Sequence, residues 1–140
     1  MRLGSDIAER LLDFAVVVVR LAGQLPRDPA GRHVASQLVR SATGGGANYE
    51  ETRAAESRED FIPKVVTPAS PAKLSSSPVG SVGVAAKEVR ETVYWLELIH
   101  RSGWTTKDVT TAIREAGELA AILGASARTA RARRACDDAR

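Results

Sequence analysis

Apolar residues recur along most of this chain at alternating steps of four and three, the spacing that lines one face of an α-helix. Asp6 can cap the first of these helices, with Glu9 placed three residues later as in a capping box. The core-facing run that follows consists of Ile7, Leu11, Phe14, Val18, Leu21 and Leu25. Gly23 and Pro26 end this first predicted helix.

The same helix carries additional apolar residues beside this run, namely Val16, Val17 and Val19. They provide more apolar surface than contact with one neighbouring helix requires. We therefore expect the first helix to be covered on several sides.

A second helix is predicted to begin at Asp28, an N-cap residue followed by Pro29 at the first helical position. Its apolar positions are Val34, Ala35, Leu38, Val39 and Ala42. Glycines 44–46 each cost up to about 1 kcal/mol relative to alanine inside a helix, so a kink at this point is an open alternative. Helical spacing resumes at Ala47, Ala54, Ala55, Phe61 and Ile62.

Proline and serine dominate residues 65–81, which predicts a flexible loop inserted before or within the start of the third helix. A solvated insertion is the main interpretation of this segment. Phosphorylation at Ser70 or Ser77, or docking of the segment as an extended Pro-rich ligand, are the alternatives.

Two more helices follow the loop. The apolar run of the third is Ala85, Val89, Val93, Leu96 and Ile99. Ser102 and Gly103 end it, and Thr105 with Asp108 forms a plausible capping box for the fourth. The apolar run of the fourth is Val109, Ile113, Ala116, Ala120, Leu123, Ala127 and Ala130.

These four helices predict an all-α fold, an antiparallel up-and-down four-helix bundle over residues 1–130 followed by a basic tail at 131–140. Aromatic residues are only 4% of the chain, so the core must consist mainly of Ala, Val, Leu and Ile. No strand-like alternation competes with this interpretation.

The net charge of +3 is concentrated near the C-terminus. Residues 128–140 hold five arginines and two aspartates, whereas the preceding residues carry equal numbers of acidic and basic side chains. Such a cluster can neutralise nucleic-acid phosphates. The candidate binding residues are Arg128, Arg131, Arg133 and Arg134. The alternative is a solvated helix end whose arginines interact favourably with the helix dipole.

Localisation signals are absent from the sequence pattern. No apolar run is long enough to span a membrane, and charged residues interrupt the N-terminal region where a secretory signal would be apolar. The single cysteine, Cys136, excludes an internal disulfide framework. We expect a cytoplasmic protein without membrane association.

Catalytic and metal-binding patterns are weak. Glu97 and His100 have the Glu-x-x-His spacing of di-iron bundles, but the other histidine, His33, has Ala30 where the second glutamate would be. The ligand count therefore predicts no metal and no cofactor. No nucleophile and base are placed together, which favours a protein that is not an enzyme.

A more distinctive pattern lies in the segments QLVRSAT (37–43), GANYEE (46–51), AESR (55–58) and KEVRET with YWL (87–92 and 94–96). Together they resemble the signature of the 23S rRNA intervening-sequence protein family of four-helix bundles. The motif positions are Arg40, Ser41, Gly46, Asn48, Tyr49, Glu50, Glu51, Glu56, Ser57, Arg58, Phe61, Lys64, Glu88, Tyr94 and Trp95.

This resemblance implies a homo-oligomeric ring, a pentamer, without established catalytic activity. The chain is also similar to accessory proteins of diversity-generating retroelements, which associate with a reverse transcriptase and with nucleic acid. Two departures are the 65–81 insertion and the glycines at 44 and 45, where relatives have a small residue and then Val or Ile. These glycines are expected to remove a core side chain and loosen the second helix.

Two functions follow as expectations. The first is a homo-oligomeric scaffold or adaptor that associates with RNA or an RNA-handling protein. The alternative is a protein-only assembly module that binds no nucleic acid.

Overall fold

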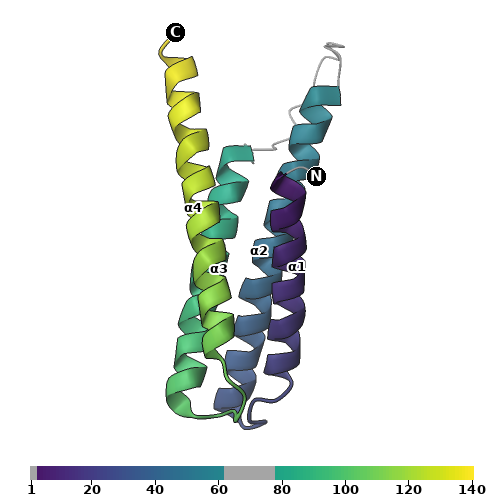
Figure 1. The fold of residues 1–140 in the computed structure, drawn as a ribbon, viewed down its shortest axis with the longest axis vertical. Coiled ribbons are helices and arrows are strands. Elements are labelled where there is room, and N and C mark those ends of the chain that lie inside the picture. Colours follow the sequence, from purple (N-terminus) through teal and green to yellow (C-terminus); the bar gives the residue numbers. More distant parts are fainter. Residues whose placement is uncertain (1–2, 62–77) are drawn as a thin grey trace.

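The computed structural model describes residues 3–61 and 78–140, with side chains described for 6–55 and 82–140. Its helices are α1 (Leu3–Ala22), α2 (Pro29–Phe61), α3 (Pro78–Ser102) and α4 (Thr110–Asp138). They run antiparallel in an up-and-down arrangement (Figure 1). α3 packs closely against both α2 and α4, while α1 packs against α2 and more sparsely against α4. The predicted all-α four-helix bundle is confirmed.

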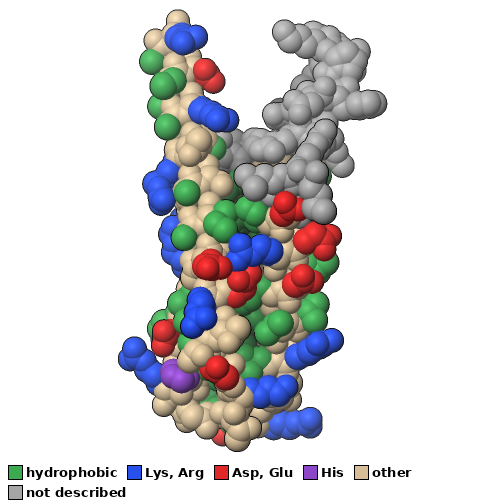
Figure 2. Space-filling view, in the orientation of Figure 1, with side chains coloured by type: hydrophobic (Ala, Val, Ile, Leu, Met, Phe, Trp, Pro, Cys, Tyr) green, Lys and Arg blue, Asp and Glu red, His purple; other side chains and the backbone are tan. Residues whose placement is uncertain are grey.

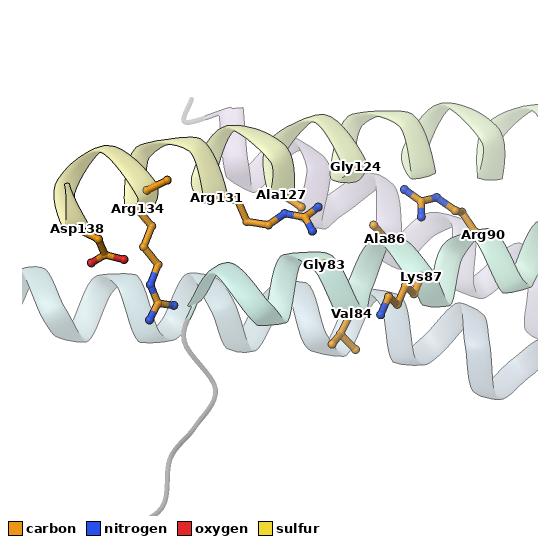
Figure 3. Close-up of a pocket in the computed structure, with 11 residues that line it drawn as sticks. Gly83, Val84, Ala86, Lys87, Arg90, Gly124, Ala127, Arg131, Arg134 and Asp138 are labelled. Atoms are coloured by element: carbon orange, nitrogen blue, oxygen red, sulfur yellow. The ribbon is translucent and has the colours of Figure 1, made fainter.

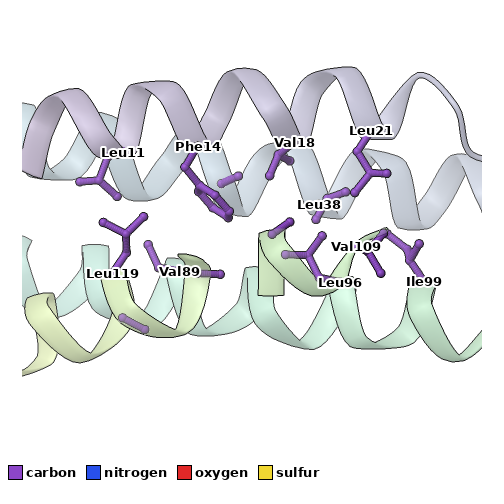
Figure 4. Close-up of a cluster of buried hydrophobic side chains, with 14 of the residues drawn as sticks. Leu11, Phe14, Val18, Leu21, Leu38, Val89, Leu96, Ile99, Val109 and Leu119 are labelled. Carbon is purple, nitrogen blue, oxygen red and sulfur yellow. The ribbon is translucent and has the colours of Figure 1, made fainter. Parts of the chain in front are cut away.

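The core lies between the four helices and is built almost entirely from aliphatic side chains (Figure 4). Leu11, Leu38, Leu96 and Leu119 are each at most 1% exposed and come from four different helices. The periodic runs predicted from the sequence supply most of this core. On α4 the buried face is rotated slightly from the predicted one, because Ala112 and Leu119 are buried. Ile113 and Ala130 are only half-buried.

The start of α2 and the end of α3 lie where the sequence predicted them. Oδ1 of Asp28 accepts a hydrogen bond from the backbone N–H of Gly31 at 2.7 Å, so this residue caps α2 as predicted, with Pro29 first in the helix. Gly103 follows α3 with φ of 63°, a left-handed conformation that glycine adopts without strain.

Other predicted boundaries were wrong. Asp6 lies inside the first turn of α1, which begins at Leu3. Thr105 and Asp108 both precede α4, and Asp108 accepts the N–H of Thr110 at 2.9 Å instead of closing a capping box. Residues 78–81, assigned to the inserted loop, begin α3. Residues 65–77 of that loop lie outside the described part of the chain.

α2 continues through its three glycines as one helix from Pro29 to Phe61, so the chain does not break there. Gly45 is buried, and a Cβ atom at this position would lie 2.8 Å from Cγ2 of Val89 on α3. The space of the expected core side chain is thus occupied by a valine from the neighbouring helix. The glycine permits a close approach of α2 and α3.

α4 extends beyond the bundle. It remains helical to Asp138, so Arg131, Arg133 and Arg134, which were predicted to lie in a tail, form its last turns. Residues 131–140 are all exposed. The ends of α2 and α4 diverge past the start of α3 (Figure 1).

Candidate nucleic-acid interface

A groove of about 620 Å³ lies between the first turns of α3 and the last turns of α4. Small residues form much of its lining, with Gly83 and Ala86 on α3 and Gly124 and Ala127 on α4. Because these residues have little or no side chain, longer side chains from both helices can lie across the space between them. We refer to this feature as the basic groove.

Cationic side chains enter the basic groove from both helices. Lys87 and Arg90 come from α3, and Arg131 and Arg134 come from α4, while Asp138 is the one carboxylate among the described residues that line it (Figure 3). The guanidinium groups of Arg90 and Arg131 point from opposite helices toward the same space. The surrounding surface of α4 carries further basic side chains (Figure 2).

Gly124 lies beneath Arg90 of the groove and beneath Arg128, which adjoins it. A Cβ atom on this residue would be 3.0 Å from Nη2 of Arg90 and 3.4 Å from Nη1 of Arg128. The two guanidinium groups therefore converge on one point of the α4 backbone. The missing side chain at Gly124 makes the approach of Arg90 possible.

Most of these cations lack an anionic partner. Over residues 6–55 and 82–140, no carboxylate lies within ion-pair distance of Lys87, Arg90, Arg128 or Arg131. Elsewhere in the bundle, arginines at helix seams are paired. Arg10 binds Glu115 at 2.8 Å across the α1–α4 seam. Lys87, Arg90 and Arg131 therefore bring positive charge to the basic groove that no carboxylate among the described residues pairs with.

Three of the four arginines predicted to bind nucleic acid lie on this side of α4. Arg131 and Arg134 line the groove, and Arg128 adjoins it at Gly124. Arg133 is two residues from Arg131, about 200° around the helix, and faces away. Sequence reasoning did not include Lys87 and Arg90 among the candidate binding residues. Their spacing of three residues signalled a shared face but not which helix lies beside it.

The family-motif positions form a second cluster, on the α2–α3 seam. Arg40 donates hydrogen bonds to Glu91 and, at 3.3 Å, to Glu88, and Nε1 of Trp95 donates to Glu91 at 3.2 Å. Beneath this exposed network, the hydroxyl groups of Ser41 and Thr92 are 2.9 Å apart and fully buried. These contacts indicate a structural role in aligning the two helices.

The remaining motif positions are spread along α2 and α3. Tyr49 packs against the core, Asn48 donates to the carbonyl of Gly44 at 2.9 Å, and Arg53 pairs with Glu50 at 3.3 Å. Gly46 is half-buried and borders α1, whereas Glu51 and Tyr94 are exposed. No side chain is described for the four positions in the last turns of α2, namely Glu56, Ser57, Arg58 and Phe61. Lys64 lies outside the described residues.

The Arg40 guanidinium, together with the Trp95 indole, lowers the pKa of Glu91 below its ordinary value. A lowered folded-state pKa means that this carboxylate stabilises the fold fully above its unfolded pKa. The contribution is lost as pH falls through the lower folded-state pKa. The Arg40–Glu91 contact therefore makes the bundle more sensitive to acid.

We expect Glu91→Gln to lower the free energy of unfolding at neutral pH, with the difference from the unmodified chain shrinking as pH falls into the acidic range. Urea unfolding followed by circular dichroism at a series of pH values measures this difference. Glu97→Gln, which removes a distant α3 carboxylate, is the control. A difference for Glu91→Gln that stays constant across the series would contradict the assignment.

No cluster of three or more potential metal-ligating side chains occurs within the part of the chain that the structure describes. Glu97 instead faces Arg101 at 3.9 Å, one turn along α3. None of the four helices, over their described residues, is both long and apolar enough to cross a membrane.

The fold is similar to that of a solved structure. The bundle resembles the solved structure of a protein of unknown function from the S23 ribosomal protein family of Bacteroides thetaiotaomicron. The two chains are 29% identical, with a TM-score of 0.62, over 84% of this chain and 94% of the other. No family model and no curated protein matches the sequence. The chain is therefore related in structure to an S23-family protein, while the relation to retroelement accessory proteins stays a prediction.

Proposed function

We propose that this chain is a member of the S23 ribosomal protein family that acts as a homo-oligomeric scaffold or adaptor, associating with RNA or an RNA-handling protein. The proposed assembly is a pentamer in the cytoplasm, and no catalytic role is assigned to it. The observation that carries the assembly is the outer face of α1.

This outer face carries three large apolar side chains on one stripe. Leu12, Val16 and Val19 are 61%, 42% and 49% exposed and follow one another at steps of four and three. Sequence reasoning expected α1 to be covered on several sides, but within one chain this face is uncovered. Green side chains lie open among charged ones over α1 (Figure 2). An apolar stripe on an exposed helix is typical of an interaction surface.

The surface continues into a shallow apolar groove of about 310 Å³ between α1 and α2. Ala8, Leu11 and Ala15 line one side of it, and Gly46 and Ala47 line the other. A second copy of the chain offers an apolar stripe to such a groove, and repeated copies joined in this head-to-tail manner close into a ring when the rotation between them permits. This geometry supports self-association.

The test is the mass of the native protein and of a Val16→Glu variant, measured by light scattering. The unmodified chain is expected at about five times the mass of one chain. Val16→Glu is expected to dissociate the assembly, because a charged carboxylate would be buried in an apolar contact. Val84→Glu is the matched control, since Val84 is 43% exposed and lies on α3, which does not pack against α1. Because Val84 borders the basic groove, both variants are measured after nuclease treatment.

A monomeric unmodified protein would refute the scaffold. Equal dissociation by Val84→Glu would refute the role of the α1 face.

The second candidate is a protein-only assembly module. It is favoured because the apolar stripe lies on α1, whereas the basic groove lies between α3 and α4, so self-association needs no residue of the groove. It predicts an assembly that purifies without nucleic acid and keeps its polypeptide partner after nuclease treatment and high salt. Release of the partner by nuclease would instead favour the RNA-associated scaffold.

A further inference from the structure

We propose that the basic groove between α3 and α4 binds single-stranded nucleic acid, holding phosphates between Arg90 and Arg131 and stacking a base on Tyr94. The inference rests on the proposed function only in treating nucleic acid as what the scaffold carries. The nucleic-acid contact is assigned to the basic groove, where residues of α3 act together with the arginines near the C-terminus.

The first argument is electrostatic. Arg90 and Arg128 converge on Gly124, and Arg131 points into the same space. Like charges held this close repel one another, yet no carboxylate of the described chain pairs with any of the three. Arg10 and Arg40, by contrast, each contact two carboxylates. An anion from outside the chain supplies the missing partner.

The second argument is the length of the groove. Its lining runs along α4 from Gly124 to Asp138, which is about 21 Å at 1.5 Å per helical residue. A free phosphate would occupy one point of such a surface. Cations spread along it from two helices fit successive phosphates of a polymer, and the small residues of its floor allow a backbone to lie close.

The third argument selects a single strand. Tyr94 lies one turn beyond Arg90 on α3 and is 60% exposed. Its ring is held edge-to-face by Trp95 at 5.0 Å between centroids, which limits its freedom. An exposed aromatic ring one turn from a groove arginine provides a surface on which an unpaired base can stack, whereas the bases of a duplex are not available to it.

The experiment measures binding of a short fluorescent single-stranded RNA, and of its duplex, by anisotropy at salt concentrations between about 50 and 200 mM. Arg90→Gln and Arg131→Gln are expected to weaken binding several-fold. Each should also reduce the slope of log K against log salt by about 0.7 for every phosphate that the variant no longer neutralises. Arg133→Gln removes the same charge from the opposite face of α4 and is expected to bind like the unmodified chain.

Tyr94→Leu provides a separate readout. Binding of the single strand should weaken by roughly five-fold or more with an unchanged salt slope, while any duplex binding stays the same. Circular dichroism confirms that each variant is folded. Inorganic phosphate and a polyglutamate peptide serve as competitors. Neither is expected to displace the RNA when it is added at the same total concentration of negative charge as the RNA.

Equal weakening by Arg133→Gln and Arg131→Gln would overturn the groove in favour of diffuse attraction to the end of α4. Displacement by polyglutamate would overturn the assignment to nucleic acid. Light scattering on the same samples separates the two proposals. An intact oligomer that binds no RNA refutes the groove alone, and a monomer whose RNA binding depends on Arg90 refutes the scaffold alone.

Discussion

Replacing Leu96 by alanine is expected to lower the free energy of unfolding by about 2 to 5 kcal/mol. Leu96 lies on α3, the helix that packs closely against both α2 and α4, and it is fully buried in the core cluster (Figure 4). Truncation removes the transfer free energy of the deleted carbon atoms and leaves a cavity. Because most domains of this kind are stable by only about 5 to 15 kcal/mol, the loss is a large fraction of the total.

Urea unfolding at several protein concentrations measures this loss and separates folding from assembly. Leu98→Ala is the control, since Leu98 lies two residues along the same helix and is only half-buried. It is expected to cost clearly less than Leu96→Ala. Equal losses for the two variants would mean that the core does not centre on the face of α3 that the structure buries.

Gly45→Val is expected to destabilise the bundle by about 1 to 3 kcal/mol, the usual range for overpacking a core. Its Cβ would lie 2.8 Å from Cγ2 of Val89, and a β-branched side chain in a helix has little rotamer freedom with which to move away. The resemblance to relatives with Val or Ile near this position gives the opposite expectation, namely that a larger side chain here would fill the core and stabilise the second helix. The structure therefore predicts that this chain does not tolerate the larger residue by itself.

Two further variants test the cause. Adding Val89→Ala to Gly45→Val should recover much of the lost stability, because the pair nearly conserves volume. Gly44→Ala should stabilise the chain by up to about 1 kcal/mol, since its Cβ would make an ordinary 3.5 Å contact with Glu88. Thermal and urea unfolding measure both effects. A stabilising Gly45→Val would show that α2 and α3 are not held at the distance found here.

The order of the helices and most of the core could be predicted from periodicity, because burial of an apolar face leaves a direct mark on sequence spacing. The N-cap at Asp28 was predictable for a similar reason, since the capping bond is local. Local reasoning failed at Asp6 and at Thr105 with Asp108. Several residues near these helix starts can serve as caps, and packing of the neighbouring turns selects among them.

The residues of the candidate site likewise fall into those that the sequence predicted and those that only the structure added. The sequence by itself determined the excess of positive charge near the C-terminus, with Arg128, Arg131, Arg133 and Arg134 as candidates, but it placed residues 131–140 in a tail. The structure extends α4 through this segment, which puts Arg128, Arg131 and Arg134 on one side of the helix. Only the tertiary structure brought Lys87 and Arg90 beside them, and only it filled the space above Gly45 with Val89. Periodicity determines which residues of one helix share a face. Which faces of two helices meet, and how closely, depends on side-chain packing across the whole bundle.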